Sequence, residues 1–345
     1  MAYSTISKPS LHFTTTTWSG SGAQQTISLP FQADWIWVKN RNNTANHAAQ
    51  DIVNAFGNRL SPDRNVALGS EANGIGTVSG SGFNFQGDYS GNGYNASGRT
   101  YVSWNWKAGG TGSANSDGDI ASTVSANTTT GFSIVKWTAN GSNSDTVGHG
   151  LGVAPKIVLY KRTDTTDNWY WVYKYVDDTL DYLHLNLDNA KADLTLGTYG
   201  FTTATTITNL GYGNTHPITA YCFAEKTGYS NIGYYTSNGN ADGPFIYTGF
   251  KPAWVLVKNV TSTAAWMLYD NKRDDDGNPN TKSLMPNLSN QEDVNAENVD
   301  FLSNGFKCRS TGVKLNNSSN KFIYMAFAEE PLIANVGTGI PATAK

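Results

Sequence analysis

The stretch AYCFAE, from Ala220 to Glu225, recurs near the end of the chain as MAFAEE, from Met325 to Glu330. A match of six residues proves little alone, so the test is whether the flanking sequence recurs in the same order. It does, because a Gly-Phe pair precedes each stretch. The phenylalanine of the stretch lies 22 residues after that of the pair in one copy and 21 in the other (223−201 and 327−306). The stretch therefore marks the end of a repeated unit.

Four motifs occur in the same order three times. The first motif places an aromatic residue before a turn, in TTWSGSG (16–22), VKWTANG (135–141) and GYYTSNG (233–239). The second motif contains a lysine near its end, in FQADWIWVKN (31–40), VAPKIVLYKR (153–162) and FKPAWVLVKN (250–259). The third is the Gly-Phe pair, and the fourth reads YVSWNWKA (101–108) in the first copy.

The spacing of these motifs separates a scaffold from its loops. The aromatic residue of the first motif precedes the lysine of the second by 21, 24 and 23 residues (39−18, 161−137 and 258−235). The middle of each copy varies more, at 44, 40 and 48 residues (83−39, 201−161 and 306−258). This pattern predicts three tandem repeats, in which Lys39, Lys161 and Lys258 lie on equivalent strands.

The local patterns favour strands over helices. The second motif alternates between two largely apolar faces, as a central strand does, and Gly and Asn clusters interrupt the chain at the spacing of short antiparallel strands. The sequence therefore predicts an all-β protein of three tandem antiparallel β-sandwich repeats, jelly-roll-like and with little helix. The best helical candidate, Asn46 to Leu60, carries apolar residues at helical spacing and is expected to be an insertion.

The fourth motif has a large face and a small face. Large side chains alternate with small ones, which indicates that one face fills a core while the other lies under a neighbouring layer. Five tryptophans in phase with these strands are expected to pack in the core: Trp35, Trp37, Trp104, Trp106 and Trp254. Each copy, near 100 residues, is expected to bury a core of its own.

Domain boundaries follow from the repeats. The expected units are 1–108, a first sandwich with an N-terminal arm, then a flexible linker at 109–123, sandwiches at 124–226 and 227–335, and a C-terminal tail at 336–345. The arm, Met1 to Thr17, is predicted either to lie on another subunit and attach the protein to a larger particle, or to be a strand of the first sandwich.

Composition argues against several classes of function. The net charge is −3 and basic residues are scattered, so nucleic acid is not expected as a ligand. The sequence has neither a signal peptide nor a membrane-spanning run, which favours folding in a cytoplasm without membrane insertion. Cys222 and Cys308 are expected to be unpaired core thiols.

Catalytic and metal-binding motifs are also lacking. No nucleophile elbow, phosphate loop or zinc-site spacing occurs, so the chain is predicted not to be an enzyme and to need no cofactor or metal. The acidic stretch Asp270 to Asn280 is expected to be a solvated turn. Tyr89, Tyr94 and Tyr212 lie within Gly and Asn loops, and we select them as candidates for ligand contact.

Several motifs together resemble a repeat family found in structural proteins of marine tailed bacteriophages: FQADWIWVKNR, SGRTYVSWNWKAGG, TVGHGLGVAPK, ADGPFIYTGFKPAWVLVKN, DFLSNGFK and IYMAFAEEP. The resemblance covers nearly the whole chain and implies a virion protein assembled in the host cytoplasm.

The expected function is a tail-associated fibre or adhesin that binds a host-surface glycan or protein. The alternatives are a capsid decoration or tail-attachment protein that binds only other virion subunits, and a glycan-degrading enzyme. A homo-oligomer is expected, a trimer in the case of a fibre.

Overall fold

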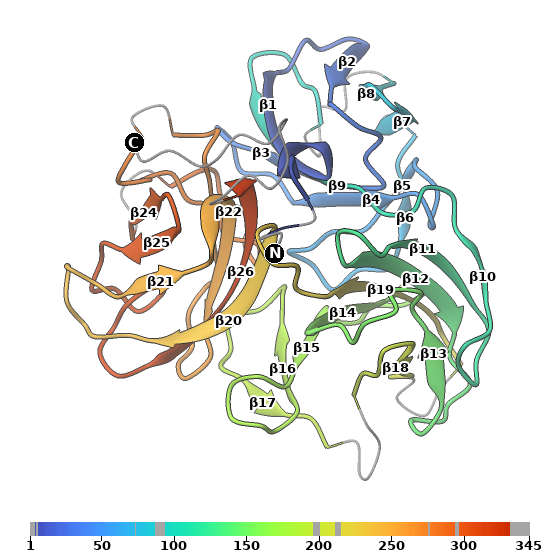
Figure 1. Cartoon of the computed structure of the whole chain (residues 1–345). Coiled ribbons are helices and arrows are strands. Elements are labelled where there is room, and N and C mark those ends of the chain that lie inside the picture. The colour runs from blue at the N-terminus through green and yellow to red at the C-terminus, as the bar shows by residue number, and fades with distance from the viewer. Residues whose placement is uncertain are drawn as a thin grey trace.

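The computed structural model describes residues 4, 6–72, 74–86, 94–195, 201–210, 215–274, 277–293 and 297–331. Strands dominate this part of the chain, and every pairing between labelled strands is antiparallel. The predicted fold class, an all-β protein built from antiparallel sandwiches, is confirmed. Three lobes surround a common centre (Figure 1).

Each lobe contains four neighbouring strands in the same order. They form a whole sheet in the first and third lobes and part of a larger sheet in the second. In the first lobe the order is β1 (Phe13–Ser19), β9 (Thr100–Trp106), β3 (Trp35–Asn40) and β4 (Ala48–Asp51). In the second it is β12 (Phe132–Thr138), β19 (Pro217–Phe223), β14 (Ile157–Arg162) and β15 (Tyr170–Tyr173). In the third it is β20 (Ser230–Thr236), β26 (Lys321–Pro331), β22 (Phe250–Asn259) and β23 (Met267–Asp270).

A smaller sheet covers one face of each larger one. These sheets are β2 (Gln25–Ser28), β8 (Gly82–Phe85) and β7 (Ile75–Ser79); β13 (Thr146–Gly148) and β18 (Thr206–Thr208); and β21 (Phe245–Tyr247), β25 (Gly305–Cys308) and β24 (Val299–Leu302). The second lobe's large sheet also includes β10 (Ser113–Asn115), β11 (Ser122–Asn127), β16 (Asp181–His184) and β17 (Ala192–Asp193).

The predicted equivalence of the three lysines is confirmed by strand register. Lys39 lies on β3, Lys161 on β14 and Lys258 on β22, the third strand in each set of four. All three side chains are buried, and each ammonium donates to a backbone carbonyl. Burial lowers the pKa of each lysine to about 8.

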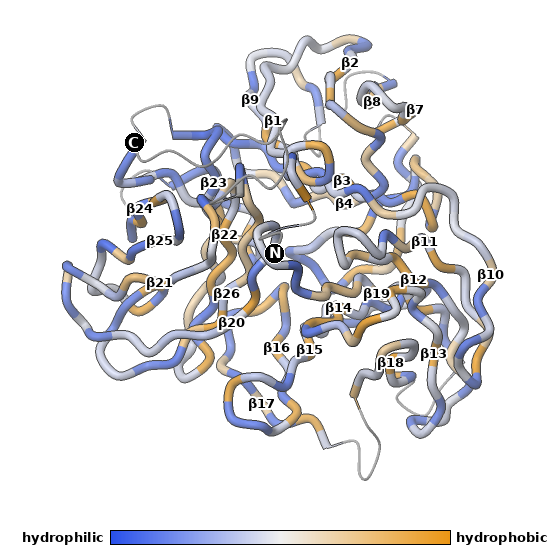
Figure 2. Tube along the Cα trace, viewed as in Figure 1, coloured by the Kyte–Doolittle hydropathy of each residue, from blue (hydrophilic) through white to orange (hydrophobic). Residues whose placement is uncertain are grey.

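The large faces of the three sheets meet in one shared core. This central core contains the tryptophans assigned to packing, together with Tyr221 and Phe223 of the second lobe and Met325 and Phe327 of the third. Apolar residues are concentrated along β19, β22 and β26, which lie toward the centre (Figure 2). The small faces instead form three separate cores beneath the smaller sheets. Each copy therefore buries only one of its two faces by itself.

Two local predictions are corrected by the structure. Residues Asn46 to Leu60 do not form a helix; they contain β4 and β5 (Asn58–Arg59), which pairs with β6 (Gly69–Ser70). Every residue of β4 is buried, so this strand has no exposed face whose polar residues would alternate with apolar ones. The expected linker at 109–123 contains β10 and the start of β11, both joined to the second sheet.

The N-terminal arm packs on its own chain. Phe13–Ser19 pairs with β9, so the interpretation as a strand of the first sandwich is confirmed for these residues. The 3-10 turn η1 (Pro9–Leu11) precedes β1, and Ile6 lies buried in the central core. Cys222 and Cys308 are free and buried, as predicted, and burial raises the pKa of both thiols to about 12.

Candidate binding surface

Two large aromatic side chains stand exposed on β21. Phe245 is 45% exposed and Tyr247 is 57% exposed, whereas Ile246 between them is buried in the core of the third lobe. Successive side chains of a strand point to opposite faces, so both rings project from the outer face of the small sheet. Because β21 is the first strand in the order β21-β25-β24, the pair lies at a sheet edge.

The other two lobes do not have aromatic residues at these positions. Ile246 lies opposite Phe306, as Ile27 lies opposite Phe83 in the first lobe and Val147 lies opposite Ile207 in the second. The residues that flank these buried positions are Thr26 and Ser28 in the first lobe, and Thr146 and Gly148 in the second. The sandwich therefore forms without aromatic rings here, and packing does not account for the pair.

A network of charged side chains begins beside Phe245. Lys307, which pairs with Phe245 across the strands, forms an ion pair with Asp242 at 2.6 Å, and Arg309 reaches the same carboxylate at 3.0 Å. Arg309 also binds Asp300 at 2.5 Å. The hydrogen bond from Lys307 is the main reason that the pKa of Asp242 is lowered. This edge thus combines apolar ring faces with charged donors and acceptors.

A glycine, Gly305, lies against the Phe245 ring. A Cβ atom at Gly305 would lie 2.9 Å from Cε2 of Phe245 and 2.1 Å from the backbone oxygen of Ile246. The Phe245 ring therefore passes close over the Gly305 backbone, where a larger residue would displace it. We define the aromatic edge as Phe245 and Tyr247 of β21 together with the backbone of Gly305 on the neighbouring strand β25.

Of the three tyrosines selected from the sequence, the structure describes Tyr94, which does not lie at this surface. Tyr94 is fully buried, and its hydroxyl accepts a hydrogen bond of 3.0 Å from Nε2 of Gln50, so it does not contact solvent. Tyr89 and Tyr212 lie outside the described residues. Sequence reasoning missed Phe245 and Tyr247, although the comparison of Phe-Ile-Tyr with Thr-Ile-Ser at the matching position in the first copy was an available signal.

The acidic stretch at 270–280 is not simply a solvated turn. Asp270 and Arg273 are fully buried, and Nε of Arg273 donates to Asp270 at 2.6 Å. The same carboxylate accepts a hydrogen bond of 2.9 Å from Nε1 of Trp104, in the first lobe. This part of the stretch therefore joins two lobes. Among the described residues, no group of three or more His, Cys, Asp or Glu side chains is placed to hold a metal ion.

Comparisons with known proteins identify a family but no activity. A family model described as a domain of unknown function, DUF7483, matches residues 8–331. That match spans nearly the whole chain, including all three lobes. No curated protein matches the sequence significantly. Within the described ranges, no helix is long and apolar enough to cross a membrane.

Proposed function

The chain belongs to the DUF7483 family of domains of unknown function, and we propose that it is a bacteriophage virion protein, a tail-associated fibre or adhesin that binds a host-surface glycan at the aromatic edge. Its other partners in this proposal are virion subunits, and it is assembled in the host cytoplasm. The observation that carries the proposal is the exposed pair of aromatic rings, Phe245 and Tyr247, on one lobe of three.

A glycan suits the chemistry of this edge. A sugar ring presents apolar C–H groups on its faces and hydroxyl groups around its rim. Tyrosine and phenylalanine offer rigid contact area at a low cost in side-chain entropy, and a tyrosine hydroxyl adds a polar contact. Lys307 lies opposite Phe245 and is ion-paired with Asp242, and these two side chains can exchange hydrogen bonds with sugar hydroxyls.

The position of the pair also suits an adhesive role. Solvent-exposed aromatic groups on a folded protein mark interaction sites when they are clustered and have no packing role. Both residues lie on an outer edge, away from the central core that joins the lobes. A ligand at this edge therefore needs no movement of the three sandwiches.

The test compares matched substitutions in equivalent strands. We expect the F245A/Y247A double variant to lose binding to intact host cells and to a glycan array, because it lacks both ring faces. The T26A/S28A variant alters the same two positions of the first lobe and serves as the control. Both variants should unfold at the same denaturant concentration as the wild type, since all four side chains are on outer faces.

Two results would count against this proposal. If F245A/Y247A binds host cells as well as the wild type does, the aromatic edge is not the adhesive site. If purified protein binds no glycan and an antibody places it on the capsid, the alternative of a decoration protein replaces that of an adhesin.

A further inference from the structure

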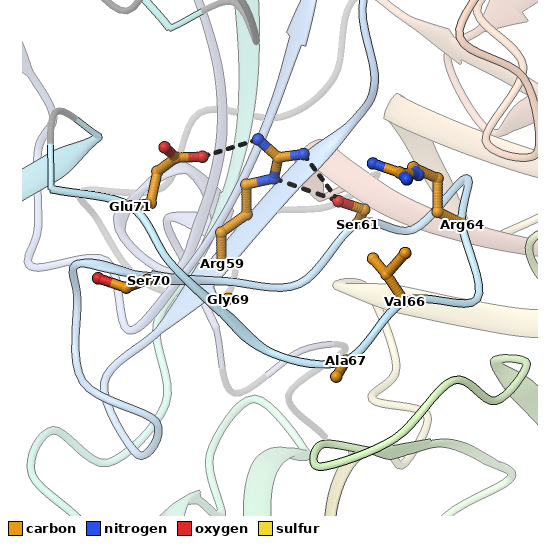
Figure 3. Close-up of a pocket in the computed structure, with 8 residues that line it drawn as sticks. All are labelled: Arg59, Ser61, Arg64, Val66, Ala67, Gly69, Ser70 and Glu71. Atoms are coloured by element: carbon orange, nitrogen blue, oxygen red, sulfur yellow. Dashed lines mark hydrogen bonds and ion pairs between the residues drawn. The ribbon is translucent and has the colours of Figure 1, made fainter.

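A pocket of about 280 Å³ opens beside β5 and β6 in the first lobe. Its lining includes two arginines, Arg59 and Arg64, with Ser61, Ser70 and Glu71 (Figure 3). A Cβ atom added to Gly69, which also lines the pocket, would meet nothing within 4 Å, so the backbone faces open space there. The pocket is distinct from the aromatic edge, which belongs to the third lobe.

One arginine is held rigidly. Arg59 is largely buried, and its Nη1 binds Glu71 at 2.7 Å while Nε and Nη2 both donate to the Ser61 hydroxyl, at 3.2 and 3.0 Å. The buried Tyr94 hydroxyl accepts hydrogen bonds from Arg59 and from Nε2 of Gln50. Such a network fixes the guanidinium plane before any ligand arrives.

The second arginine is held much less. Arg64 is exposed, and no hydrogen bond or ion pair of its side chain is found within the described ranges. In Figure 3 Ser61 stands between the two guanidinium groups, and Glu71 lies on the side of Arg59 away from Arg64. Two arginines against one glutamate leave the pocket with a net charge of +1 (2−1), carried on its Arg64 side.

The equivalent positions in the other lobes do not have this charge. Leu60, Leu183 and Leu284 are equivalent because they lie opposite Ala49, Trp171 and Leu268 on matching strands. By the same alignment, Arg59 corresponds to Tyr182 and Ser283, and Arg64 corresponds to Leu187 and Leu288. The scaffold is therefore built twice without either arginine, so the fold of a lobe does not require the pair.

We propose that this pocket binds one oxyanion, a carboxylate or a sulfate group, carried by a small ligand. Guanidinium groups bind such anions through two parallel hydrogen bonds, and a charged acceptor strengthens both. Arg59 offers a preorganised cation at the pocket wall and Arg64 closes on the anion from solvent. The volume is at the lower end for ligand pockets, which suits a single sugar or a similarly small molecule.

Calorimetric titration of the full-length protein tests the proposal with named probes. The probes are sodium glucuronate for a carboxylate, sodium sulfate for a sulfate and methyl glucoside as the neutral sugar. We expect at least one of the two anions to bind and the neutral sugar not to bind. Tight binding of glucuronate alone would identify the carboxylate, and equal binding of both anions would identify the shared oxyanion chemistry.

Two variants separate a built site from general charge. R64A should weaken anion binding by at least about tenfold, because it removes a charge-assisted pair of hydrogen bonds. R99A removes one positive charge elsewhere and should leave binding unchanged. Both should match the wild type in thermal stability. Absence of anion binding by the wild type, or equal weakening by R64A and R99A, would overturn the proposal, whatever the outcome at the aromatic edge.

Discussion

The indole Nε1 of Trp169 in the second lobe donates a hydrogen bond of 2.9 Å to the carbonyl oxygen of Ser61 in the first lobe. The same bond recurs from Trp266 of the third lobe to His184 of the second, at 3.0 Å. Between the first lobe and the third, Nε2 of His47 takes the place of the indole and lies 3.2 Å from the carbonyl oxygen of Met285. The three lobes are thus joined three times by one type of contact.

Backbone hydrogen bonds accompany each of these contacts. At the first junction, Asp167 donates to Asn65 at 2.7 Å and Leu68 donates to Thr163 at 2.9 Å. The matching bonds elsewhere are Ala264 to Asp188 and Lys191 to Val260, and Ala45 to Ser289 and Glu292 to Arg41. The last pair joins the third lobe back to the first, so a tandem chain closes into a ring with approximate threefold symmetry.

Removing one indole donor should weaken a junction. W169F is expected to lower the free energy of unfolding by about 2 kcal/mol, because the Ser61 carbonyl loses its partner in a buried site. Urea unfolding followed by far-UV circular dichroism measures this change. Y247F, at an exposed aromatic position, should change stability by less than about 0.5 kcal/mol. Equal stability of W169F and the wild type would show that the bond contributes nothing.

An isolated repeat should not fold alone. Residues 124–226, expressed separately, would expose the large face that carries Tyr221 and Phe223 in the central core. A sheet with two apolar faces needs both covered, so we expect aggregation or a state without a cooperative unfolding transition. Thermal unfolding and dye binding to exposed apolar surface measure this. A soluble monomer with a sharp transition would contradict the shared core.

How much of this architecture the sequence could predict depends on the feature. The order and spacing of the repeated motifs correctly predicted that Lys39, Lys161 and Lys258 lie on equivalent strands. This worked because the motif that contains each lysine includes a strand, so matching motifs give matching strands. The alternation of large and small side chains in the fourth motif showed that one face of β9 carries large side chains. The composition of that face does not reveal which other sheet packs against it. The central core was therefore not predicted, and separate cores were expected instead.

Two predictions made from local sequence patterns were wrong. Asn46 to Leu60 has apolar residues at helical spacing, but tertiary pairing of Ala48 and Ala49 with β3 overrides that local preference. Tyr94 lies within a stretch of sequence rich in Gly and Asn, which suggested exposure, whereas its ring packs in the first lobe's own core. The aromatic edge was missed because Phe-Ile-Tyr reads as an ordinary buried strand until its counterparts in the other repeats are aligned.

The His47 junction should make stability depend on acidic pH. Trp37 Nε1 donates to Nδ1 of His47 at 2.9 Å, so Nε2 carries the proton and donates to Met285. Burial, with a further contribution from Lys39, lowers the pKa of His47 well below 6.5. The unfolded chain therefore binds a proton that the fold excludes, so this contribution to stability is full above pH 6.5 and is lost as pH falls through the folded pKa.

The variant H47Q tests how much of the pH dependence of stability comes from protonation of His47. Glutamine can accept from Trp37 and donate to Met285 without titrating. Urea unfolding at a series of pH values below 6.5 should show a steeper loss of stability for the wild type than for H47Q. Parallel curves would show that other groups cause the acid dependence.

The buried lysines predict a second dependence, at alkaline pH. Because the folded pKa of Lys258 is about 8, below the ordinary value of 10.5, the unfolded chain binds more protons in that interval. Stability should therefore rise with pH between 8 and 10.5, and the rise should be smaller in K258M. Chemical unfolding across this interval measures it. The exposed Lys174 provides the control variant, K174M, which should keep the full wild-type rise.

The N-terminal arm should stabilise the ring as well as any particle that it joins. Ile6 is buried in the central core, so deleting Met1 to Lys8 should lower the free energy of unfolding by about 2 kcal/mol, the value for burying one such side chain. I6A should produce a similar loss while leaving the rest of the arm in place. If the deletion costs stability but the protein still enters particles, the arm is a part of the core and not the attachment element. Normal stability together with failure to enter particles would instead assign the arm to attachment.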